Sequence, residues 1–209
     1  SNTKTNRKER KSNTGKIITY RQARQFKEMY DYPADVSIGL NGARSQVVNF
    51  ENKKTNPTVS INGGDENYLQ LNGYEIAFGR NFNKTDVESG QDICIIGKDV
   101  ASKLFGAKYE RGLEKVIRVG NNKYRVVGIT KEKGSSSFLQ ADNVVFATYT
   151  NVRQRYANRN QSFSIAIMVP DINLMESAIG EAEGVFRTIR GLDIIEDNNF
   201  YVDKSDSIA

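Results

Sequence analysis

The segment 116–130 limits the folds open to this chain more than any other stretch of its sequence. The runs 116–119 and 124–130 are rich in valine and isoleucine, and Gly120-Asn121-Asn122 lies between them. Such runs predict strands, and the short Gly/Asn turn predicts that they pair as an antiparallel hairpin. At least part of the fold is therefore expected to be an antiparallel sheet.

Further strands and helices follow one another along the chain without a fixed period. Strands are predicted at 34–40 and 46–51, around an Asn41-Gly42 turn, and at 58–61, 74–78, 93–96, 143–147, 163–169 and 200–202. Helices are predicted at 17–30, with Thr19 as a cap, and at 67–71, 98–105, 152–156 and 172–189. Because no βα unit repeats, the pattern predicts the α+β class.

The residue types of the chain exclude most catalytic and metal-binding chemistry. It has no histidine, and Cys94 is its one cysteine, which excludes Ser-His-Asp triads, Cys-His pairs and the usual zinc sites. The paired acids Asp65/Glu66 and Asp193/Glu196 lie in turn-like stretches and are interpreted as surface charges. We therefore expect no catalytic residue, no metal site and no cofactor, and we do not expect an enzyme.

Positive charge is concentrated at the start of the chain. Residues 1–29 carry nine Lys or Arg against two Glu, a net charge of +7, which leaves −2 for the rest of a chain whose net charge is +5. We expect 1–16 to be a flexible basic arm that begins with the Ser1-Asn2 remnant of a cleaved tag. The mildly acidic body behind the arm argues against binding to nucleic acid.

Five short segments occur in a fixed order between residues 73 and 146. They are Gly73-Tyr-Glu-Ile-Ala-Phe-Gly-Arg-Asn-Phe82, Asp92-Ile-Cys-Ile-Ile-Gly97, Leu104-Phe-Gly106, Ile117-Arg-Val-Gly-Asn-Asn-Lys-Tyr-Arg-Val-Val-Gly-Ile129 and Asp142-Asn-Val-Val-Phe146. In this order the chain resembles the periplasmic core domain of MacB-type and FtsX-like ABC-transporter permeases. The signature residues are Gly79, Arg80, Phe82, Gly97, Phe105, Gly106, Gly120, Tyr124 and Gly128.

Three of the signature residues also have a physical interpretation. Gly79 allows a tight exit from the preceding strand. Arg80 is expected to pair with a carboxylate, and Phe82 is expected to fold back onto the core.

The resemblance implies a two-lobed extracytoplasmic domain. A discontinuous, porter-like βαβ lobe would comprise 17–64 and 150–205, and a small α/β lobe, 65–149, would be inserted between its two parts. The domain would lie between membrane helices, on the periplasmic or extracellular side of the cytoplasmic membrane.

The resemblance also implies a function and partners. The domain would couple the ATP-driven motion of membrane helices to export or to mechanotransmission outside that membrane. Its partners would be its own membrane helices, an ATPase domain or subunit, a second permease in a homodimer or pseudo-dimer, and a periplasmic adaptor protein. Candidate contact residues are Ser135, Ser136, Ser137 and Phe138 in a Gly/Ser loop, and Arg153 and Tyr156 on a short basic helix.

Two other classes of protein remain open at this stage. The first is a secreted or lipid-anchored binding or adhesion module that works without a transporter. The second is a hydrolase that uses a carboxylate pair, which requires two carboxyl groups about 5–10 Å apart in a concave site.

Overall fold

The computed structural model describes residues 17–133, 140–157 and 161–203. The chain divides into two compact units: one contains the residues up to Asp35 together with those from Ile167, and the other contains Val36–Ala166. We call them the terminal unit and the central unit. The predicted lobes, 17–64 with 150–205 and 65–149, have different boundaries and stay a prediction.

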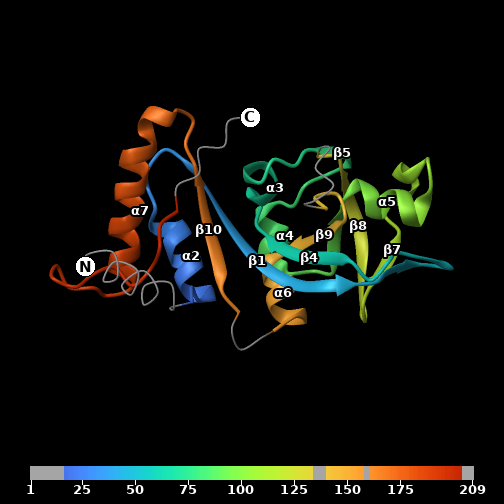
Figure 1. Ribbon diagram of the computed structural model, residues 1–209, viewed down its shortest axis with the longest axis horizontal. Helices are drawn as coiled ribbons and strands as arrows, with labels where there is room; N and C mark the ends of the chain where they lie inside the picture. Colours follow the sequence, from blue (N-terminus) through green and yellow to red (C-terminus); the bar gives the residue numbers. More distant parts are fainter. Residues whose placement is uncertain (1–16, 134–139, 158–160, 204–209) are drawn as a thin grey trace, which may run out of the picture. The chain divides into compact units, whose positions relative to one another are not determined.

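Two helices that are far apart in the sequence pack together in the terminal unit (Figure 1). Helix α2 spans Tyr20–Met29 and α7 spans Met175–Ile189, which follows the 3-10 turn η2 at Ile172–Leu174. The predicted cap, Thr19, is confirmed, since its side chain accepts a hydrogen bond from the backbone of Gln22 at 3.2 Å in a capping box. Because α2 has ten residues and is marginal alone, its packing against α7 must hold it.

Aromatic rings form the core of the terminal unit. Phe26 on α2 meets Phe186 on α7 edge-on, with ring centroids 6.2 Å apart, and the Tyr30 hydroxyl donates to the carbonyl of Ala178 at 3.0 Å. The ring of Phe200 also packs edge-on against Phe186, with ring centroids 4.8 Å apart. The strand predicted at 200–202 is wrong: these residues are not in a strand, and Phe200 is held by its ring contact.

The central unit is built on a mixed sheet. Its strands run in the spatial order β10-β1-β4-β9-β6-β8-β7-β2-β3, with β5 paired to β8. The strands are β1 (Asp35–Gln46), β2 (Val48–Phe50), β3 (Lys53–Lys54), β4 (Val59–Gly64), β5 (Ile76–Gly79), β6 (Ile93–Ile96), β7 (Val116–Val119), β8 (Asn122–Thr130), β9 (Val144–Thr148) and β10 (Phe163–Met168). The β4–β9 and β6–β8 pairs are parallel, whereas the β7–β8 hairpin is antiparallel as predicted.

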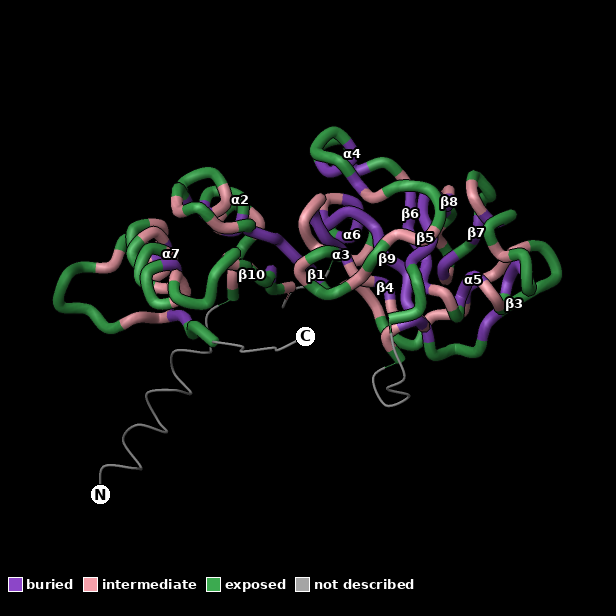
Figure 2. The backbone as a smooth tube through the Cα atoms, turned by 90° about the horizontal axis from the view of Figure 1, so that it is seen from above, coloured by how far each residue is buried: buried purple, intermediate pink, exposed green. Residues whose placement is uncertain are grey.

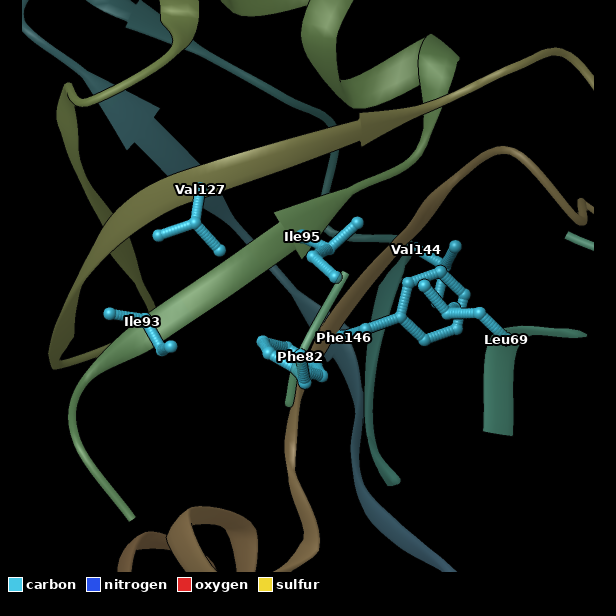
Figure 3. Packing of buried hydrophobic residues seen from close by; sticks show 7 residues of the cluster. All are labelled: Leu69, Phe82, Ile93, Ile95, Val127, Val144 and Phe146. Atoms are coloured by element: carbon cyan, nitrogen blue, oxygen red, sulfur yellow. The ribbon is translucent and has the colours of Figure 1, made fainter. Parts of the chain in front are cut away.

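Short helices lie around this sheet. They are α3 (Tyr68–Leu71), α4 (Lys84–Ser89), α5 (Lys98–Phe105), the 3-10 turn η1 (Tyr109–Gly112) and α6 (Tyr149–Arg155). The strand 93–96 and the helix 98–105 were predicted with these bounds, and the α+β class is confirmed. The hydrophobic core of the unit includes a cluster of buried side chains on β6, β8 and β9. Leu69 and Phe82 belong to the same cluster (Figure 3).

Two local predictions are wrong for identifiable reasons. Asn41-Gly42 is not a turn, since β1 continues through it and changes register against β4 between Asn41 and Ala43. No helix is predicted between 71 and 98, yet Lys84–Ser89 form α4, which Asn83 and Asp86 cap reciprocally. Sheet pairing overrides the turn signal at Asn41-Gly42, and reciprocal capping stabilises the helix that the sequence analysis missed.

The lone cysteine provides a test of the packing around β6. Cys94 is fully buried, and this burial raises the pKa of its thiol. We expect the native thiol to react with a disulfide reagent on the order of 100-fold more slowly than an exposed cysteine, because only opening of the sheet uncovers it. The comparison is with Lys108→Cys, at an exposed position, and equal rates for the two thiols would contradict the packing described.

Candidate partner-contact site

The two predicted contact residues that the structure describes are Arg153, on helix α6, and Tyr156, its C-cap residue. Thr148 caps α6 by accepting a hydrogen bond from the Asn151 backbone at 3.2 Å. Asn151 and Val152 are buried, whereas Arg153 and its next two neighbours are exposed. Seven residues do not make a stable helix in isolation, so the inner face must fix the position of the outer one.

Glycine allows the inner face of α6 to lie directly on the sheet. A Cβ atom on Gly63 of β4 would lie 2.8 Å from the Tyr149 Cα atom and 3.0 Å from Cβ of Val152. A Cβ on Gly42 of β1 would lie 3.1 Å from the Val152 side chain. Any larger residue at Gly63 would push the helix outward, and the absence of a side chain there fixes the close approach.

The side chain of Asn151 connects α6 to two other parts of the central unit. Its amide nitrogen donates to Asp92 Oδ1 at 2.7 Å and to the Gly90 carbonyl at 3.1 Å. Its amide oxygen accepts a hydrogen bond from the Tyr124 hydroxyl on β8 at 2.7 Å. Burial raises the pKa of Tyr124 above its usual value, so the phenol stays protonated and continues to donate.

An ion pair extends this network to the surface. Arg155 donates from Nε to Asp92 Oδ1 at 3.1 Å and from its terminal nitrogen to Oδ2 at 2.7 Å. Burial alone would raise the pKa of Asp92, but the hydrogen bonds from Arg155 and Asn151 outweigh it and hold that pKa below its usual value. The guanidinium of Arg155 is therefore committed to the fold, although the residue is exposed.

The predicted contact residues have different environments. Arg153 is exposed on the outer face of α6, whereas Tyr156 is half-buried and its hydroxyl oxygen is enclosed. Ser135, Ser136, Ser137 and Phe138 lie outside the described residues. Contact through this surface stays a prediction, and among the described candidates Arg153 is the better placed for it.

The described segments on either side of 134–139 are tied together. The Lys133 ammonium lies 4.3 Å from the ring centroid of Tyr74, and its backbone N–H donates to Asp142 Oδ1 at 2.9 Å. The Tyr74 hydroxyl donates to the carbonyl of Ala141 at 2.8 Å, and burial raises its pKa to about 12. Tyr74 thus contacts both described segments, at Lys133 and at Ala141.

The signature residues at 79–82 form one structural unit. Gly79 has a φ of +78°, and a Cβ there would lie 2.2 Å from the Val127 carbonyl. Arg80 pairs with Asp86 at 2.6 Å. Phe82 is buried in the core cluster. These contacts fold the chain after β5 back onto the sheet.

The remaining signature residues have backbone or packing roles in the central unit. A Cβ on Gly97 or on Gly128 would lie 2.3 or 2.4 Å from a backbone carbonyl. Phe105 packs against Phe50, and Gly106 ends α5 with a φ of +77°. Gly120 forms the hairpin turn with a φ of +56°, and Tyr124 is the phenol that bonds Asn151.

Asp65 does not have the solvated position expected from the sequence. It is fully buried between β4 and α3, and it accepts hydrogen bonds from the Ile38 backbone at 2.8 Å, from the Asn67 backbone at 3.0 Å and from Ser37 Oγ at 3.1 Å. A carboxylate that receives several hydrogen bonds can be buried. The sequence signal for this role was its place directly after Gly63-Gly64, where a chain leaves a strand.

Side chains able to hold a metal ion do not gather in the described part of the chain: no group of three or more His, Cys, Asp or Glu converges there. Within the same residues, no helix is long and apolar enough to cross a membrane.

The fold is shared with extracytoplasmic domains of ABC-type transporters. The extracellular domain of the transporter YknZ from Gram-positive bacteria superposes with a TM-score of 0.63 at 19% identity, over 84% of this chain and 85% of that one. The periplasmic region of MacB from Actinobacillus actinomycetemcomitans gives a TM-score of 0.66 at 16% identity, over 83% and 75%. At such identities the similarity establishes the fold alone.

Sequence comparison establishes the family. The model of the MacB-like periplasmic core domain matches residues 2–185, and the chain belongs to this family. The chain is therefore the extracytoplasmic domain of a MacB-like permease, as the segments between residues 73 and 146 predicted. A secreted or lipid-anchored module without a transporter is not favoured by this result.

Curated relatives point the same way. The macrolide export ATP-binding/permease protein MacB of Hahella chejuensis is 28% identical over 173 residues, and MacB 2 of Yersinia pestis bv. Antiqua is 31% identical over 174, each covering 82% of this chain. The pyoverdine export protein PvdT of Pseudomonas syringae is 27% identical over 130 residues, 62% of this chain. The chain spans about a quarter of the length of the two MacB relatives and 19% of PvdT.

Removal of the Asn151 amide tests whether this side chain holds α6 in place. We expect Asn151→Ala to lower the free energy of unfolding by about 2–4 kcal/mol, because it leaves the buried Tyr124 phenol and the Gly90 carbonyl without their partner and removes one donor to Asp92. Gln154→Ala, at an exposed position on the same helix, is the control and should change stability by less than about 0.5 kcal/mol. Chemical denaturation measures both, and equal effects would refute the role assigned to Asn151.

Proposed function

We propose that this domain couples ATP-driven movement of membrane helices in an ABC-transporter permease to export or mechanotransmission outside the cytoplasmic membrane. The family match over residues 2–185 carries the proposal. ATP hydrolysis belongs to another domain or subunit, as the names of the ATP-binding/permease relatives suggest. The permease acts as a homodimer or pseudo-dimer in the inner membrane, and its domain meets a periplasmic adaptor protein.

The connectivity of the chain supports mechanical coupling. The residues before Asp35 and those after Ile167 share the terminal unit, so segments on both sides of the domain act on one body. The packing of aromatic rings on α2 and α7 holds the two helices of the terminal unit together. The chain then enters the central unit through β1 and leaves it through β10, which are neighbouring strands. A displacement of the terminal unit is thus delivered to the central unit at two adjacent strands.

Rigidity of the central unit supports the same mechanism. Helix α6 rests on glycine-lined strands, and the Asn151 network joins it to β8 and to the segment before β6. Close-packed interiors transmit displacement because they resist compression. A rigid central unit therefore moves as one body, and any partner on its surface moves with it.

The location of the domain is testable by chemical labelling of the full-length permease. We expect Lys108→Cys, an exposed position, to react with a membrane-impermeant maleimide in cells whose outer envelope is permeabilised but whose cytoplasmic membrane is intact. The parent protein is the internal control, because its buried Cys94 should stay unlabelled until it is denatured. Labelling of Lys108→Cys only after lysis of the cytoplasmic membrane would contradict the location.

Coupling is testable by distance measurement on the assembled, membrane-embedded transporter. Spin labels at Lys108→Cys report the distance between the domains of two paired permeases by pulsed electron resonance. We expect the distance distribution to differ between nucleotide-free and ATP-trapped states, with no difference when the partner ATPase cannot bind ATP. Identical distributions in both nucleotide states would refute mechanical coupling through this domain.

A further inference from the structure

Four side chains line up across four neighbouring strands at one end of the central sheet. Lys54 lies opposite Asn49, Asn49 lies opposite Arg118, and Arg118 lies opposite Lys123. Directly opposed residues of antiparallel strands place their side chains on one face, about 5 Å apart. The strands β3, β2, β7 and β8 therefore present three cations in one line. We call Lys54, Arg118 and Lys123 the cation row.

The cations of the row reach solvent, whereas Asn49 between Lys54 and Arg118 is half-buried, with its Oδ1 atom enclosed. Helix α5 contacts β2 and β3 on the opposite face, where Phe50 packs against Phe105 with ring centroids 4.7 Å apart. All three cations are exposed, and Val116, two residues from Arg118 and on the same face, is 53% exposed. In Figure 1 this hairpin region lies at the end of the central unit, beside α5.

The cation row has no compensating charge in the described part of the chain. The ion pairs of the central unit use other lysines and arginines, at Arg80, Lys98, Arg125, Lys131 and Arg155. Arg118 and Lys123 stand directly opposite each other, and like charges in that relation destabilise a sheet. A bound anionic group would offset this repulsion, which makes the row a site for an acidic partner.

The terminal unit carries a surface of complementary chemistry. Ile194 and Ile195 are 93% and 87% exposed, the highest values among the large apolar side chains described. Asp193 precedes them, and Glu196 and Asp197 follow, all three exposed. We call residues 193–197 the acidic tip. Two apolar side chains between carboxylates match a surface that offers cations and an exposed valine.

The acidic tip is ordered before any partner binds. Arg187 of α7 donates to the Asp193 carbonyl at 2.7 Å, to the Glu196 carbonyl at 2.9 Å and to Asn198 Oδ1 at 2.6 Å. The Ile194 backbone donates to Asp193 Oδ1 at 2.8 Å. A pre-organised loop loses little conformational entropy on binding. In Figure 2 the loop that follows α7 is coloured as exposed.

We propose that the acidic tip of one copy of this chain binds the cation row of a second copy. The carboxylates pair with Lys54, Arg118 and Lys123, and the isoleucines cover Val116. If two copies make this contact reciprocally, they form a dimer. The contact deepens the proposed function by naming a surface for the pairing of permeases, and it rests on that pairing.

Charge reversal on either surface tests the contact on the chain itself. The row variant is Arg118→Glu with Lys123→Glu, which keeps two like charges opposite each other and so leaves the sheet with a similar repulsion. The tip variant is Glu196→Lys with Asp197→Lys. We expect the parent chain to dimerise at about 50 mM salt in sedimentation velocity. Near 500 mM salt the dissociation constant of the dimer should be at least about tenfold higher, because salt screens exposed charges. Each variant alone should be monomeric.

Mixing the two variants provides the decisive measurement. In the mixture an acidic row meets a basic tip, and a basic row meets an acidic tip, so a dimer should re-form with about the affinity of the parent chain. Lys84→Glu with Lys108→Glu, at exposed positions away from the row, is the matched control and should dimerise normally. Ile194→Ser with Ile195→Ser should weaken the dimer at both salt concentrations.

Several results would overturn the proposal. A parent chain that stays monomeric at all concentrations, or variants that fail to complement each other, exclude this contact. Binding of the row to vesicles containing phosphatidylglycerol without self-association assigns it to lipid instead. None of these outcomes bears on the labelling and nucleotide-dependent distances of the full permease, so failure of this contact is distinct from failure of the proposed function.

Discussion

The amide of Asn151 uses its donors and its acceptor inside the central unit, where it joins α6 to Asp92 before β6 and to Tyr124 in β8. A buried amide costs free energy unless it is hydrogen-bonded, and a network of this kind stabilises the unit only when its members are satisfied together. Displacement of α6 would leave a phenol and a carboxylate unpaired at the same time. The helix therefore cannot shift independently of the sheet, and the outer face with Arg153 keeps a fixed position.

Close backbone approach adds to this constraint. Gly63 brings α6 onto β4, and Gly128 brings the chain at Arg80 onto β8, each within a distance that a Cβ atom would not permit. The hydrogen bonds of Asn151 and the contact with Gly63 thus both restrict α6, whereas Gly128 fixes the segment that follows β5. The result suits a body that is displaced as a whole.

The sequence predicted elements where local pattern and long-range contacts agree. The strand 93–96, the helix 98–105 and the 116–130 hairpin have local signals that the sheet reinforces. The prediction failed at Asn41-Gly42 and at Asp65, because the first depends on the pairing of β1 with β4 and the second on hydrogen bonds from Ser37 and Ile38. Neither contact is visible in a window of neighbouring residues. The family signature, in contrast, was readable because its glycines and aromatic residues serve packing that the family shares.

The cation row could not be predicted from the sequence for the same reason, because it depends on contacts between distant segments. Alternation marks Arg118 as a solvent-facing residue, but it does not say which residue of another strand lies opposite. The pairing register of the strands gives this information. It places Lys54 and Lys123, which are 64 and 5 residues away in the sequence, in line with Arg118. A scaffold common to a transporter family can hold its core residues in a recognisable order while its exposed rows change freely. Pairing register and surface charge, which only the folded chain displays, define the cation row.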